Sequence, residues 1–211
     1  WDMDGTLIDS EPFWITCQVR MMTEAGIPWT EAAAAGMIGN PLTVSAQLLR
    51  DGGLDLPVPE IVDRIVSLVA AELQAHLPWK PGMRRLLAQT KAAGIRCALV
   101  TMSYPRLVAP VLEQLPDTFD AVVTGTSVTN GKPHPEASLT AMEQLGLRPE
   151  ECLAIEDSLP GVASARASGA VTIAAEGHVP LSEAGGHFLL TDFSDITVDD
   201  LRRLHREGLS R

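Results

Sequence analysis

From Gly82 onward the sequence alternates short apolar segments with longer segments of helical pattern, and this rhythm limits the folds open to the chain. Short, continuously apolar segments are typical of strands that are buried on both faces. When helices separate such strands, the strands form a parallel sheet covered on both sides. The sequence therefore predicts an α/β domain. Strands are predicted at 95–100, 121–123, 152–155, 171–174 and 188–190. Helices are predicted at 83–93, 104–115, 135–145, 160–168 and 198–207.

The segment between the first residues and Pro78 has a different pattern and is predicted to be a separate helical domain. Apolar residues such as Val62, Val66 and Val69 recur at the spacing of one helix face, and no strand-like run interrupts them. The turn-forming run from Pro78 to Gly82 then marks a boundary. The predicted domains are a core of residues 1–12 and 80–211 and an inserted cap of residues 13–79.

The first strand of the core is incomplete in this sequence. A parallel sheet needs an apolar strand before Asp2, and only Trp1 precedes that residue. We therefore expect the natural chain to contain further residues before Trp1.

Composition excludes several classes of partner. The net charge is −11 and the pI is about 4.8, so the chain offers no basic surface for nucleic acid. Cys17, Cys97 and Cys152 lie far apart without metal-binding spacing, which fits a reducing compartment. No apolar run approaches the roughly 20 residues of a membrane span. We expect a cytoplasmic monomer, with local positive charge wherever it binds an anionic substrate.

The run Asp2-Met3-Asp4-Gly5-Thr6 carries the strongest chemical signal. It puts one acid at a predicted strand end and a second at the start of the following loop, and Gly5 allows a sharp turn. Asp2 can act as a nucleophile and Asp4 as a general acid and base. An acidic turn without function is the alternative, but this five-residue pattern arises by chance at roughly 10⁻⁵ per position.

Glu156 and Asp157 directly follow the predicted strand 152–155. Two acids at the end of a buried strand are unfavourable unless a partner offsets their charge. Mg²⁺ takes one or two carboxylates together with phosphate oxygens and water. Asp2, Asp157 and the backbone carbonyl of Asp4 would fit that pattern. A helix N-cap is the alternative role for Asp157.

Two further segments lie where strands of the sheet lead into loops. Ligands bind at the carboxyl ends of parallel strands, so these segments can converge with the two acidic motifs although they are distant in sequence. Thr101, Met102 and Ser103 follow the strand ending at Val100, and their hydroxyl and N–H groups could hold phosphate oxygens. A simple helix cap is the alternative for this segment. Lys132 lies between Gly131 and Pro133, where its ammonium could offset charge on a transferring phosphoryl group. Taken alone, a lysine is more often a solvated surface group.

In this order, the Asp-x-Asp-Gly-Thr, Thr, Lys and Glu-Asp motifs resemble those of the haloacid dehalogenase superfamily, in particular the phosphatases with a helical cap after the first motif. The resemblance covers essentially the whole chain. It implies a Rossmann-like parallel sheet core with an inserted all-helical cap. It also implies that Asp2 attacks phosphorus, that Asp4 protonates the leaving oxygen, and that Thr101 and Lys132 hold the phosphoryl group. Asp157 would bind Mg²⁺, and Glu156 would lie beside the metal.

The stretch Asp9-Ser10-Glu11-Pro12-Phe13-Trp14 resembles hexose-phosphate phosphatases, including 2-deoxyglucose-6-phosphate phosphatases. Related β-phosphoglucomutases usually carry a histidine at the position of Trp14, so its absence favours a phosphatase over a mutase. Trp14 could stack on a sugar face or simply be a buried aromatic residue.

The predicted function is a Mg²⁺-dependent phosphatase that hydrolyses a small phosphate ester, such as a sugar phosphate, through an aspartyl-phosphate intermediate. The alternatives are a phosphosugar mutase and, with less support, a catalytically silent binding protein of the same fold. A dehalogenase is disfavoured because that chemistry needs neither the metal nor the second acid, Asp4.

Overall fold

The computed structural model describes residues 1–38, 40–178, 180–182 and 185–210. The chain divides into two compact units. The core unit contains Trp1–Asp9 and Trp79–Arg211, and the helical unit contains Ser10–Pro78, against the predicted cap of 13–79.

The core unit is built on parallel strands whose two groups are joined by the N-terminal segment. β1 (Ala98–Val100) pairs with β2 (Ala121–Val123). β3 (Leu153–Glu156) pairs with β4 (Val171–Ala175), and β4 pairs with β5 (Phe188–Leu190). The Trp1 carbonyl accepts a hydrogen bond from the Val100 N–H at 2.8 Å, and the Asp2 N–H donates to the Ile155 carbonyl at 3.1 Å. The first two residues therefore lie between β1 and β3.

A cavity of about 420 Å³ is lined by Trp1 and by the segments that lead into β1 and β3. Cys97 and Cys152 are among the lining residues, one on each side.

Two predicted strands begin later in the structure than their apolar runs suggest, because local turns use their first residues. The Ile95 N–H donates to the Thr90 carbonyl at 3.2 Å and so completes the end of the preceding helix. Likewise, the Cys152 N–H donates to the Pro149 carbonyl at 3.0 Å and closes a short 3₁₀ turn that the sequence pattern does not predict. Residues whose N–H groups complete a turn are not available to extend the ladder.

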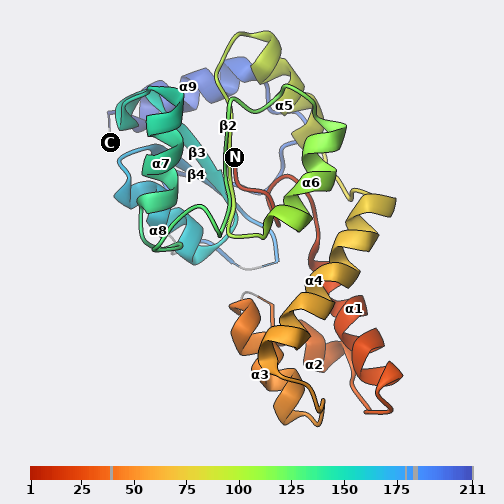
Figure 1. Ribbon diagram of the computed structural model, residues 1–211. Helices are drawn as coiled ribbons and strands as arrows, with labels where there is room; N and C mark the ends of the chain where they lie inside the picture. The colour runs from red at the N-terminus through yellow and green to blue at the C-terminus, as the bar shows by residue number, and fades with distance from the viewer. Residues whose placement is uncertain (39, 179, 183–184, 211) are drawn as a thin grey trace. The chain divides into compact units, whose positions relative to one another are not determined.

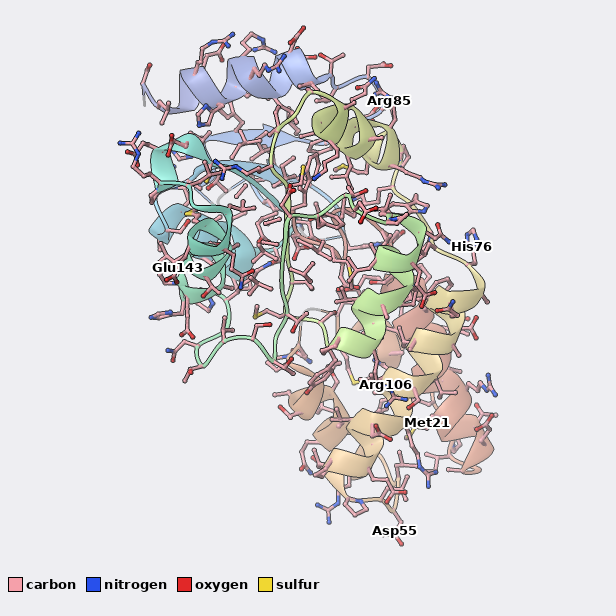
Figure 2. The ribbon with its side chains drawn as sticks, turned by 45° about the horizontal axis from the view of Figure 1, so that its top comes forward. Met21, Asp55, His76, Arg85, Arg106 and Glu143 are labelled. Atoms are coloured by element: carbon pink, nitrogen blue, oxygen red, sulfur yellow. The ribbon has the colours of Figure 1, made fainter. Side chains whose placement is uncertain are left out.

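Helices cover the strands of the core unit (Figure 1). The core helices are α5 (Met83–Ala92), α6 (Pro105–Gln114), α7 (Glu136–Leu145), α8 (Leu159–Ala167) and α9 (Val198–Gly208). α7 contacts β1 and β2, α8 contacts β3 and β4, and these two helices contact each other. α9 contacts both α5 and β4, and the Arg85 side chain of α5, labelled in Figure 2, donates to the carbonyls of Ser194 and Ile196 just before α9. The parallel, helix-covered sheet confirms the predicted α/β class.

The helical unit contains helices and no strand within residues 10–38 and 40–78. Its helices are α1 (Glu11–Glu24), α2 (Glu31–Ala35), α3 (Leu42–Asp51) and α4 (Val58–Ala75). α4 packs against α1 and α3, and buries Ile61, Ile65 and Val69 along one face. Met21, labelled in Figure 2, is one of the apolar residues that α1 buries. In the described part of the chain, no helix is both long and apolar enough to span a membrane.

Candidate active site

The structure brings most of the predicted site residues together at one edge of the sheet. Asp2 and Asp4 lie in the N-terminal segment, Thr101–Ser103 follow β1, and Glu156 is the last residue of β3. Lys132 lies in the loop after β2. Because the carboxyl ends of parallel strands meet at one edge, residues distant in sequence become neighbours there.

Lys132 forms the centre of a buried ion-pair network. Its Nζ lies 2.7 Å from Asp2 Oδ1 and 2.6 Å from Glu156 Oε1. It also donates to the Val100 carbonyl at 2.9 Å. The three charged side chains are only 4–9% exposed, so they depend on one another rather than on water for stabilisation.

The surroundings of these groups shift their pKa values. Burial alone would lower the pKa of Lys132, but the carboxylates of Asp2 and Glu156 raise it above its ordinary value, so Lys132 remains an ammonium. Burial raises the pKa of Glu156 to about 7, against the opposing effect of Lys132. Burial, followed by the charges of Asp2 and Glu156, raises the pKa of Asp157 to about 8.

The carboxyl groups of Asp2, Glu156 and Asp157 fit a divalent cation. One oxygen from each can be chosen so that all of them lie within 4.8 Å of one another. Oxygen donors of this kind suit a hard ion such as Mg²⁺. Among the described residues, the buried Oε2 atom of Glu156 has no hydrogen-bond partner. A buried carboxylate oxygen without a partner is costly, and a nearby cation would reduce that cost.

Asp4 is held by hydroxyl groups from the loop after β1. Ser103 Oγ donates to Asp4 Oδ2 at 2.6 Å, and Thr101 Oγ1 lies 3.5 Å from the same oxygen. The Ser103 N–H in turn donates to Thr101 Oγ1 at 3.0 Å. Met102 contacts the lysine loop through its sulfur, which accepts from the Lys132 N–H at 3.4 Å. The segment predicted to hold phosphate thus also orients the predicted acid and base.

Gly5 brings the first motif against Asp157. Its φ is +77°, and a Cβ on this residue would overlap the Asp157 carboxylate. Only glycine combines that backbone conformation with such a close approach. The next residue, Thr6, donates from Oγ1 to Asp157 Oδ1 at 3.4 Å.

Thr6 and Lys80 were not predicted as site residues from the sequence. Thr6 belongs to the first motif, whose spacing does not indicate which way its side chain points. Lys80 donates from Nζ to the Gly5 carbonyl at 2.7 Å, yet in sequence it is only a lysine before a Pro-Gly boundary. Trp14 lies on α1 of the helical unit, where its side chain is half-buried, and its role in substrate binding stays a prediction.

Comparisons with known proteins agree with this arrangement. The model of the haloacid dehalogenase-like hydrolase family matches residues 1–169. Hexitol phosphatase B of Escherichia coli K12 is 29% identical over 95% of this chain and 94% of its own length. A phosphorylated carbohydrates phosphatase of Thermotoga maritima is 31% identical over 80% of each chain.

Solved structures of similar proteins have the same fold over nearly the whole chain. CbbY from Rhodobacter sphaeroides, solved in complex with phosphate, has a TM-score of 0.83 and 25% identity, and covers 95% of this chain and 96% of its own. A β-phosphoglucomutase-like protein from Thermotoga maritima has a TM-score of 0.81 and 28% identity, and covers 96% of each chain. From the matching family model and the acidic site at the carboxyl edge of its parallel sheet, the chain belongs to the haloacid dehalogenase-like hydrolases.

Proposed function

We propose that this protein is a Mg²⁺-dependent phosphatase that hydrolyses a small phosphorylated carbohydrate through an aspartyl-phosphate intermediate on Asp2. One observation carries the proposal: Lys132 Nζ lies within 2.7 Å of Asp2 and Glu156, with Asp157 close by. These contacts support the proposal because they bring the proposed nucleophile, a cation and oxygen atoms that could bind a metal close together. Phosphoryl transfer depends mainly on such positioning and on electrostatic stabilisation.

In the first step, the Asp2 carboxylate attacks phosphorus while the bond from phosphorus to the ester oxygen breaks. Asp4 gives its proton to the departing alcohol oxygen, so the alcohol leaves neutral. Lys132 stabilises the charge on the transferring phosphoryl oxygens. The hydroxyl groups of Thr101 and Ser103, which already contact Asp4, lie where they can hold both the acid and the phosphoryl group.

In the second step, Asp4 takes a proton from a water molecule as that water attacks the phosphorus of the aspartyl-phosphate. The bond to the Asp2 oxygen breaks, and inorganic phosphate leaves. A single residue can serve both steps because the proton that it gives to the alcohol is replaced by the one that it takes from water.

The metal would be held by the side chains of Asp2 and Asp157 and by the backbone carbonyl of Asp4, with Glu156 beside it. When bound, Mg²⁺ would supply positive charge that reduces the repulsion between the nucleophile and the phosphate. Asp2 and Asp4 are the groups of this chain that take part in the bond changes, and Lys132 stabilises the charge on the phosphoryl oxygens. The buried pairing of Asp2 with Lys132 fixes the direction in which the Asp2 carboxylate faces.

The substrate class follows from the relatives. Hexitol phosphatase B and the phosphorylated carbohydrates phosphatase are similar to this chain over most of its length. We therefore expect hexitol and hexose monophosphates to be turned over better than phosphoglycolate, although phosphoglycolate phosphatases are also among the relatives.

The test is a panel of phosphate esters incubated with Mg²⁺ or with EDTA, in which inorganic phosphate and isomerised phosphosugar are both measured. We expect phosphate release that needs Mg²⁺. Asp2→Asn should abolish this release, while Asp199→Asn, on the exposed surface of α9, should keep wild-type activity. Isomerised sugar with little free phosphate would instead support the mutase, and no reaction with any ester would support a silent binding protein.

A further inference from the structure

We propose that Lys80 is a positioning residue for the phosphatase reaction: its ammonium fixes the Gly5 turn, and with it Asp4, and adds positive charge beside the metal carboxylates. Nothing in the sequence pattern assigns a role to Lys80. The expected change in turnover rests on the proposed function, whereas the expected change in Mg²⁺ affinity can be measured without it.

The backbone places Lys80 beside the first motif. Its N–H donates to the Leu7 carbonyl at 2.9 Å, and the preceding residue, Trp79, forms a bridge with Ile8. The first motif itself is a tight loop, in which the Gly5 N–H donates to the Ile8 carbonyl at 2.7 Å. Trp79 and Lys80, the first residues of the second core segment, are therefore hydrogen-bonded to the loop that carries Asp4.

The side chain of Lys80 then reaches back across this loop. Its Nζ donates to the Gly5 carbonyl at 2.7 Å. Gly5 directly follows Asp4, and its backbone lies against the Asp157 carboxylate. A hydrogen bond from a charged donor is stronger than one between neutral groups, so this contact restrains the turn between two site residues.

A third segment encloses the Lys80 ammonium. A Cβ on Gly177 would lie 3.2 Å from Lys80 Nζ and 3.8 Å from the Gly5 carbonyl oxygen. His178, the next residue, contacts Asp9 at 2.7 Å, which attaches this loop to the segment just after the first motif. Lys80 thus lies between the loop that carries Asp4 and the loop of Gly177 and His178.

Lys80 also interacts electrostatically with the Asp157 carboxyl group. This gives the residue two effects of opposite sign. Its hydrogen bond favours the reactive position of Asp4, whereas its positive charge repels a divalent cation bound by Asp157. Loss of Lys80 should therefore reduce turnover and tighten Mg²⁺ binding, a combination that simple destabilisation would not produce.

The test compares Lys80→Met and Lys80→Arg with Lys91→Met. Lys91 is a suitable control because its partner is Asp120, at the opposite ends of the strands from the site. For Lys80→Met we expect kcat to fall about 10- to 100-fold, because a displacement of about 1 Å can cost that much. KM for the ester should change less than about threefold, since the lost contact positions Asp4 rather than substrate.

Mg²⁺ binding is measured by calorimetry on the folded protein without substrate. Lys80→Met should bind Mg²⁺ about three- to tenfold more tightly, and Lys80→Arg should match wild type because it keeps the charge. Lys80→Arg should also retain more kcat than Lys80→Met, and Lys91→Met should change neither quantity.

Wild-type kcat and unchanged Mg²⁺ affinity in Lys80→Met would overturn the inference while leaving the proposed function intact. If Lys80→Met does not fold, Lys80→Gln decides, because it removes the charge but keeps a polar side chain: tighter Mg²⁺ binding with reduced kcat supports the role, and wild-type kcat with wild-type Mg²⁺ affinity refutes it. A wild-type protein that releases phosphate from no ester would instead refute the proposed function, and the calorimetric comparison would still test the charge of Lys80.

Discussion

Replacement of Lys132 by methionine should destabilise the metal-free protein strongly. Methionine keeps the length of the side chain but leaves the carboxylates of Asp2 and Glu156 buried without a cation. Removal of one partner from a buried ion pair costs about 3–5 kcal/mol. Lys132 has two such partners, at 2.7 and 2.6 Å, and both are less than 10% exposed, so we expect the upper end of that range.

The measurement is thermal unfolding in EDTA at neutral pH. For a chain of this size, 1 kcal/mol lowers Tm by about 2–4 °C, so Lys132→Met should lower Tm by about 10–20 °C. Lys91→Met is again the control: its surface pair with Asp120 is about one-third exposed, and such pairs contribute less than about 1 kcal/mol.

A second substitution tests the cause of this loss. Glu156→Gln in the Lys132→Met background removes one of the two unpaired carboxylates, so it should recover at least about 1 kcal/mol. In the wild-type background the same change should not stabilise the protein, because Lys132 then loses a partner. If the free energies of unfolding of Lys132→Met and Lys91→Met differ by less than about 1 kcal/mol, the ion-pair network does not stabilise the site.

Gly5, Ser103 and Cys17 allow three further tests. Gly5→Ala should lower phosphatase activity at least about 100-fold, because the new Cβ would overlap the Asp157 carboxylate. Gly26→Ala is the control: its φ is +74° but no atom lies within 4 Å of a new Cβ, so it should cost only about 1 kcal/mol of stability and keep activity. Equal losses of activity in the two variants would contradict the overlap with Asp157. Ser103→Ala removes the 2.6 Å hydrogen bond to Asp4 and should lower kcat about 10- to 100-fold, and an unchanged kcat would mean that Asp4 does not need this donor. Burial raises the pKa of Cys17 to about 11, above its ordinary value near 9. The unfolded chain therefore loses this proton first, so between about pH 9 and pH 11 the free energy of unfolding should fall more steeply in the wild type than in Cys17→Ala; equal slopes in the two proteins would refute this.

The sequence predicted the strands best where the apolar run is bounded on both sides by polar or turn-forming residues. The predicted bounds 121–123 and 188–190 match β2 and β5. β1 and β3 start later than predicted because the N–H groups of Ile95 and Cys152 complete the turns before them. Hydropathy alone does not show which partner a backbone group will choose, so these boundaries needed the structure.

In the site, too, the sequence predicted which residues meet but not the contacts between loops. Asp2, Lys132 and Glu156 were predicted to converge because each follows a strand of one parallel sheet, and the structure brings them into contact. Contacts between loops were not predictable. The hydrogen bond from Ser103 to Asp4 and the one from Lys80 to Gly5 depend on the directions of side chains across turns, which no spacing rule supplies.

The charges of the site explain how a chain with a net charge of −11 could act on an anionic substrate. The sequence contains lysine at only three positions, and two of these, Lys80 and Lys132, lie at the site. They face four carboxyl groups, those of Asp2, Asp4, Glu156 and Asp157, so the fully ionised site has an excess of two negative charges without a metal.

Burial, and after it the charges of the neighbouring acids, raises the pKa values of Glu156 and Asp157, so both acids resist ionisation when no metal is bound. A bound divalent cation would bring the total to zero, or to one positive charge when Asp4 is protonated, so a phosphate dianion would then meet a nearly neutral site with donors close to its oxygens. Recognition would thus depend on short-range contacts rather than on long-range attraction. Accordingly, raising the salt concentration should change kcat/KM far less for this protein than for a phosphatase that attracts its substrate with a basic surface.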